Sequence, residues 1–167
     1  MRLSILSALA AAALLAACSS DVPINDVGGA GTGTTASAAD PGITGAQVPG
    51  SKEQFDAEVG NTVYFDTDSY SLSSDAQSQL QRQAAWLTQY PARTLTVEGH
   101  ADERGTREYN LALGERRSNS VANYLVALGV DKARLSVISY GKERPLCTES
   151  DESCWSQNRR GVSAINP

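Results

Sequence analysis

Several residue types are scarce in this chain of 167 residues, and each scarcity excludes a class of protein. One histidine and three cysteines cannot supply a structural zinc site with several such ligands unless carboxylates contribute. A formal charge of −5 argues against a broad basic surface for nucleic acid. No apolar run reaches the length that a membrane-spanning helix needs. The length allows one domain of ordinary size. After these exclusions, the class that remains is a small acidic protein with one domain.

The first 18 residues form an export signal that ends in a cysteine. Arg2 precedes a short apolar core, and residues 1–17 have the form of a secretory signal peptide rather than of a spanning helix. The run Leu15-Ala16-Ala17-Cys18 resembles the bacterial lipobox, in which a diacylglycerol is attached to the cysteine sulfur. We therefore expect lipidation of Cys18, and the resemblance implies an outer-membrane destination. An ordinary signal peptide with a chance cysteine near its cleavage site is the alternative.

Residues 18–50 are expected to be a disordered tether. Between Gly28 and Gly50 the only charged residue is Asp40, and most of the others are Gly, Ala, Thr, Ser and Pro. Such a stretch buries too little apolar surface to offset the entropy of ordering it. As a flexible chain the tether would span roughly 30 Å. It would place a folded domain, predicted over residues 51–167, away from the lipid surface.

The sequence of residues 51–167 predicts a two-layer α/β (α+β) sandwich. A capping box at Ser51 opens a short helix toward Val59, and a second one at Ser74 and Gln77 opens a helix that ends before Pro91. A long helix follows from about Arg107 to Leu128. Strands are expected at 62–65, 94–98, 135–140 and 162–165. The order β-α-β-α-β-β predicts helices on one face of a mixed four-stranded sheet.

Two cysteines remain once Cys18 is assigned to the lipid. Cys147 and Cys154 flank a loop after the third predicted strand, and an exported chain meets an oxidising compartment. We expect a structural disulfide between them, with two free surface thiols as the alternative.

The polar segment from Glu98 to Arg117 is the densest candidate site. On a helix, Arg117 falls within the apolar stripe that faces the sheet, and such a charge needs a carboxylate or another anion. Asp102 lies just past the second strand and is the best candidate partner. Held apart at the mouth of a groove, the two would bind a zwitterion, whereas a direct Asp102–Arg117 salt bridge would need no ligand. Gly114 either leaves space beside the guanidinium or packs closely against a neighbour.

A resemblance to a known family favours a zwitterionic ligand between Asp102 and Arg117 over a direct salt bridge. Glu98 to Arg117, together with Val63 to Asp66, Tyr140 to Pro145 and Trp155 to Arg160, resembles the peptidoglycan-binding domain of OmpA-like proteins. With the lipobox and the tether, the chain resembles the peptidoglycan-associated lipoproteins of the Tol-Pal system. That family binds the diaminopimelate of the cell-wall stem peptide without covalent linkage. The resemblance implies ligand contacts by Asp102 and Arg117, and secondary contacts or pocket walls at Phe65, Asp66, Arg104, Thr106, Asn110 and Leu113.

The resemblance further implies a non-enzymatic tether between outer membrane and peptidoglycan, with no cofactor and no metal. It implies the β-propeller protein TolB as a second partner and a part in envelope integrity and cell division. A glycan hydrolase using Asp66 with Asp68, or Asp102 with Glu103, is the rival hypothesis, although adjacent side chains such as those of Asp102 and Glu103 point apart on a strand. A third is another OmpA-like lipoprotein with different partners.

Overall fold

The structure is a computed structural model that describes residues 48–167. The predicted signal peptide 1–17, the lipidation site Cys18 and nearly all of the predicted tether lie outside the described residues. The described elements, in chain order, are the helix α1 (Lys52–Gln54), the π-helix η1 (Phe55–Val59), β1 (Thr62–Tyr64), α2 (Ser74–Gln89), β2 (Leu95–His100), α3 (Arg107–Ala127), the 3-10 helix η2 (Lys132–Arg134), β3 (Leu135–Gly141), α4 (Glu152–Asn158) and β4 (Arg160–Ile165).

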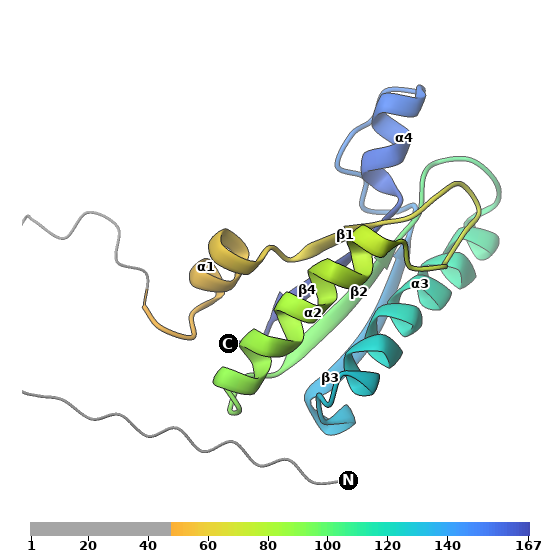
Figure 1. The fold of residues 1–167 in the computed structure, drawn as a ribbon. Coiled ribbons are helices and arrows are strands. Elements are labelled where there is room, and N and C mark those ends of the chain that lie inside the picture. The colour runs from red at the N-terminus through yellow and green to blue at the C-terminus, as the bar shows by residue number, and fades with distance from the viewer. Residues whose placement is uncertain (1–47) are drawn as a thin grey trace, which may run out of the picture. The chain divides into compact units, whose positions relative to one another are not determined.

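One mixed four-stranded sheet carries the domain, in the order β1-β4-β2-β3. The last strand lies in the interior of the sheet, antiparallel to β1 on one side and to β2 on the other. β2 and β3 pair in parallel, and α3 is the crossover between them. Figure 1 shows α2 and α3 together on one face of the sheet. This arrangement confirms the predicted α/β sandwich of two layers.

Local sequence signals explain the two long helices. Ser73, one residue before the predicted cap, accepts a hydrogen bond from the backbone N–H of Ala76, and Thr106 caps α3 in the same way. Helix α3 ends at Ala127, two residues before Gly129, whose φ of +96° only glycine adopts readily. Buried residues of both helices form one core with Val97 of β2 on the inner face of the sheet, among them Leu80, Leu87, Val121 and Leu125.

Helix α4 differs from the predicted order of elements. Seven residues form this helix between β3 and β4, where we expected only a loop. Only Cys154 and Asn158 are buried in it, so it has no apolar stripe that the sequence could reveal. Asp151 caps it by accepting a hydrogen bond from the N–H of Cys154. In Figure 1, α4 stands at one end of the domain, beyond the sheet.

The predicted disulfide between Cys147 and Cys154 is present. It ties the middle of the segment between β3 and α4 to the first turn of α4, with the two Cα atoms 5.2 Å apart. Asn158 closes the same segment, because its Oδ1 accepts from the N–H of Leu146 and its Nδ2 donates to the carbonyl of Cys147. Among residues 48–167 no helix is long and apolar enough to cross a membrane.

Candidate functional site

A cavity of about 180 Å³ lies where β2 leads into α3. Four of the predicted site residues line it, namely Asp102, Arg104, Asn110 and Leu113. The lining is completed by Asp68, which the sequence suggested only for a hydrolase, and by Thr67 and Tyr109, which sequence reasoning did not select. The hydroxyl group of Tyr109 donates to the carboxylate of Asp68, so that contact joins the loop after β1 to the first turn of α3.

Asp102 is the acidic centre of this cavity and is only 7% exposed. Arg104 holds its carboxylate with two side-chain bonds, from Nε to Oδ1 at 3.2 Å and from Nη2 to Oδ2 at 2.6 Å. Arg159 approaches Oδ2 from the other side, at 3.5 Å. Burial alone would raise the pKa of Asp102, but the bonds from Arg104 and Arg159 outweigh it and keep that pKa below its usual value. The carboxylate is therefore ionised.

The turn between Asp102 and α3 is fixed by the helix itself. The amide Nδ2 of Asn110 donates to the carbonyl oxygens of Arg104 and Thr106 at 2.8 and 3.1 Å. Thr106 is the cap of α3, so its side chain serves the helix and does not line the cavity. Lys142 closes the turn from β3 by donating to the carbonyls of Glu103 and Gly105. Asp102 and Arg104 thus stand on a rigid support.

Arg117 is fully buried, and this differs from the open pair that we expected. Its guanidinium donates to three backbone carbonyls, those of Asp66, Ser69 and His100, at 2.8 to 3.0 Å. These bonds hold the loop after β1 over the side chain, which explains why the guanidinium is sealed from solvent. The direct Asp102–Arg117 salt bridge, the alternative without a ligand, is not formed either.

The buried guanidinium of Arg117 has no carboxylate within 4 Å among the described residues. Burial lowers its pKa to about 10, against the opposing attraction of Asp102. Three carbonyl dipoles compensate the charge only in part, since a buried ion is stabilised best by a counter-ion. The loop between the cavity and Arg117 therefore covers a positive charge without a direct counter-charge.

Phe65 and Asp66 do not line the same cavity as Asp102. They line a neighbouring hollow of about 410 Å³, together with Tyr64, Ser71, Ser73, Ser156, Gln157 and Arg159. Arg159 lines only this hollow but connects it to the cavity, because its Nε donates to the carbonyl of Phe65 while its Nη1 contacts Oδ2 of Asp102. Sequence reasoning missed Arg159 as a site residue. The only available signal was the arginine pair Arg159-Arg160 at the end of a segment quoted for its family resemblance.

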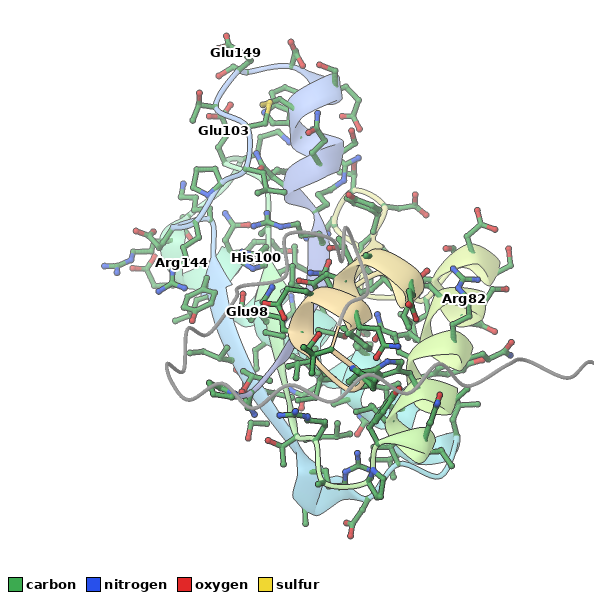
Figure 2. All side chains as sticks on the ribbon, turned by 90° about the vertical axis from the view of Figure 1, so that its left-hand side faces the viewer. Arg82, Glu98, His100, Glu103, Arg144 and Glu149 are labelled. Atoms are coloured by element: carbon green, nitrogen blue, oxygen red, sulfur yellow. A yellow bond between two sulfur atoms is a disulfide. The ribbon has the colours of Figure 1, made fainter. Side chains whose placement is uncertain are left out.

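Neither proposed acid pair of a hydrolase lines one common cavity, since Asp66 and Asp68 line different cavities and Glu103 does not line the cavity of Asp102. Asp102 is occupied by two arginines, whereas Glu103 is exposed and accepts from the indole N–H of Trp155. Figure 2 shows Glu103 near the end of the domain that carries α4, far from Arg82 on α2. Among residues 48–167 no group of three or more His, Cys, Asp or Glu side chains is placed to hold a metal ion.

Residues 64–159 match the OmpA family. The chain is 49% identical over 162 residues to the "Peptidoglycan-associated lipoprotein" of Rhizobium meliloti, which covers 96% of this chain and 86% of that protein. It is 55% identical over 124 residues to the protein of the same description from Agrobacterium fabrum, covering 74% of this chain and 70% of that one.

Solved structures agree with the sequence relatives. The crystal structure of the peptidoglycan-associated lipoprotein from Burkholderia pseudomallei matches with a TM-score of 0.62 and 44% identity, over 64% of this chain and 90% of that one. The C-terminal domain of Helicobacter pylori MotB shares the fold at 21% identity and a TM-score of 0.59, over 64% and 84% of the two chains. The chain therefore belongs to the OmpA family and, within it, to the peptidoglycan-associated lipoproteins.

Proposed function

We propose that this protein binds peptidoglycan non-covalently through the diaminopimelate of the stem peptide. In this proposal a lipid on Cys18 holds the chain in the outer membrane, and the domain at 51–167 grips the wall from the periplasmic side. The relatives described as peptidoglycan-associated lipoproteins support this role. Two acyl chains or more anchor a protein durably, whereas one chain anchors it only marginally.

The observation that carries the proposal is the charge arrangement around the cavity of about 180 Å³. Diaminopimelate within the wall presents an ammonium and a carboxylate on one carbon. Asp102 supplies a buried carboxylate for the ammonium, and Arg104, whose side chain is 38% exposed, lies beside it with further N–H groups that can donate to the ligand carboxylate. Arg117 lies behind the loop with a charge that no carboxylate in residues 48–167 contacts.

Arg117 enters the proposal through an exchange of partners. A ligand carboxylate would replace the carbonyls of Asp66 and Ser69 as acceptors, provided that the loop carrying them moves aside. The exchange is favourable because a charged acceptor forms a stronger bond with a guanidinium than a neutral carbonyl does. Asn110 and Leu113 would then form the floor beneath the ligand, and Thr106 would contribute by capping the helix.

Retention on purified cell wall tests the pocket. We expect Asp102→Asn and Arg104→Ala to lose most of the bound fraction in a pull-down with the full chain. Asp75→Asn and Arg82→Ala on α2 are matched controls, since they remove the same charges far from the cavity and should bind as the parent protein does. Undiminished retention of both cavity variants would overturn the assignment of the ligand site.

Competition identifies the ligand group. A soluble stem peptide containing diaminopimelate should release the protein from the wall, whereas the same peptide with lysine at that position, whose side chain keeps the ammonium but lacks the carboxylate on the same carbon, should release it poorly. Equal release by both peptides would show that the site recognises only an ammonium. This comparison separates a receptor for a doubly charged group from a general cation site.

We further propose a place in the Tol-Pal system, with TolB as the protein partner and a part in envelope integrity and cell division. Capture of TolB from periplasm by the full chain tests this proposal. Failure of capture, with wall binding intact, would favour a different OmpA-like lipoprotein. The proposal is of a binding protein and not of an enzyme, and release of soluble fragments from purified peptidoglycan would contradict it.

A further inference from the structure

Helix α4 contacts Arg104, a residue that lines the cavity, through the aromatic side chain of Trp155. The guanidinium carbon of Arg104 lies 4.2 Å from the centroid of the Trp155 ring. Trp155 is itself oriented, because its indole N–H donates to Oε1 of Glu103 at 3.0 Å. The same Arg104 holds the carboxylate of Asp102 with Nε and Nη2. The ring therefore forms a platform that keeps Arg104 extended beside Asp102.

Helix α4 cannot hold this platform by its own stability. It has seven residues, and isolated helices shorter than about 12 residues are marginal in water. Its position depends on the disulfide at Cys154, whose side chain is fully buried, and on the bonds from Asn158 to Leu146 and Cys147. The disulfide is therefore part of the support for Arg104.

We infer that Trp155 positions Arg104 beside Asp102, and that the Cys147–Cys154 disulfide, by holding α4, raises the affinity of the cavity for its doubly charged ligand. This inference rests on the proposed function. Arg104 has a long, flexible side chain, and ordering it on binding costs free energy. A side chain that is already stacked on an indole ring loses less freedom when the ligand carboxylate arrives. Trp155 and the disulfide are thus positioning elements that act through Arg104.

The expected loss of affinity follows from the strength of the contact between Arg104 and Trp155. Loss of one exposed cation–π contact corresponds to a two- to five-fold weaker affinity, by the usual range of about 0.5 to 1 kcal/mol. We expect this loss in Trp155→Leu, and a smaller loss in Trp155→Phe, which keeps a ring but no N–H for Glu103. The reduced protein and the Cys147→Ser, Cys154→Ser double variant should bind at least as weakly as Trp155→Leu.

A double-mutant cycle measures the coupling between Trp155 and Arg104, which would be absent if Trp155 had only a structural role. Affinity for a soluble stem peptide containing diaminopimelate is measured by calorimetry on the full chain in detergent. Trp155→Leu should weaken binding in the parent protein and have no further effect in Arg104→Ala. An equal effect in both backgrounds would overturn the inference. So would equal affinities of the oxidised and reduced proteins, measured where circular dichroism shows both to be folded.

Tryptophan fluorescence provides a second readout. The chain has two tryptophans, of which Trp86 is buried in the core and Trp155 stacks on Arg104. Peptide binding should change the emission of the parent protein, and Trp155→Phe should abolish that change. If the parent protein does not bind the peptide at all, the proposed function fails. If it binds with the same affinity as Trp155→Leu, only the positioning role fails.

Discussion

Gly99 of β2 and Gly114 of α3 lie in direct backbone contact. A Cβ atom built on Gly99 would lie 1.8 Å from the carbonyl oxygen of Gly114, and one built on Gly114 would lie 2.3 Å from Oγ of Ser139. Of the two explanations that the sequence left open for Gly114, the structure therefore shows close packing. The contact brings α3 so near to β2 that Arg117, one turn further along the helix, reaches the carbonyl of His100.

Gly99→Ala is expected to destabilise the domain by about 3 kcal/mol or more, because the new methyl group meets backbone that cannot move aside. The free energy of unfolding in urea measures the effect. Gly161→Ala in the neighbouring strand is the matched control, since its Cβ would lie 3.3 Å from the nearest atom. That variant should stay within about 1 kcal/mol of the parent protein. Similar stabilities of the two variants would contradict the close contact.

His100 makes the stability of the domain sensitive to acid. It is 2% exposed, and neither ring nitrogen has a hydrogen-bond partner. Burial, with the charges of Arg160 and Arg144, lowers its pKa to about 4. Among the described residues Glu98 is the one acidic group within 4 Å of a ring nitrogen, at 3.6 Å from Nε2, and the Tyr140 ring packs against the imidazole. Figure 2 shows His100 among Glu98 and Arg144 on this side of the domain.

The unfolded chain binds a proton at His100 below pH 6.5, whereas the folded protein binds it only near pH 4. The stabilisation from neutral His100 is thus complete above pH 6.5 and is lost as the pH falls from 6.5 to about 4. The loss reaches at most about 3 kcal/mol. His100→Gln should show a shallower fall in unfolding free energy over this range. An unchanged pH profile would show that His100 is not the group that titrates.

Most of the fold follows from signals that the sequence states locally. Caps, periodic apolar residues and Gly129 fixed the two long helices, and the parity of the remaining cysteines predicted their bond. The order of the strands was not predictable in this way, since β4 enters between β1 and β2 through contacts distant in sequence. Helix α4 was missed because a disulfide and Asn158 hold it in place of an apolar face.

The candidate site, too, could be predicted from the sequence only where local spacing determines it. Helical spacing placed Arg117 correctly on the face toward the sheet, and it is buried there. Spacing could not reveal that the loop after β1 folds over it, since that contact joins residues 48 positions apart. Nor could it reveal that Arg159, from the other end of the domain sequence, shares Asp102 with Arg104. Charge partners of this kind are set by tertiary contacts.

The loop after β1 should depend on Arg117 for its order. The guanidinium holds the carbonyls of Asp66 and Ser69 with separate nitrogens, and a lysine ammonium cannot reach both together with His100. We expect Arg117→Lys to lose about 2 to 4 kcal/mol of stability, since bonds from a charged donor contribute about 1.5 to 3 kcal/mol each. Amide hydrogen exchange over residues 66–70 should become faster.

Arg134→Lys is the matched control for this experiment. Arg134 holds a different loop by the same means, because its guanidinium donates to the carbonyls of Leu87, Tyr90 and Arg93. Its replacement should speed exchange over residues 90–93 and leave residues 66–70 protected. If Arg117→Lys leaves the loop after β1 as protected as Arg134→Lys does, the guanidinium is not what holds that loop. The exchange of carbonyl for ligand carboxylate proposed for Arg117 would then lose its structural basis, whereas binding at Asp102 and Arg104 would be unaffected.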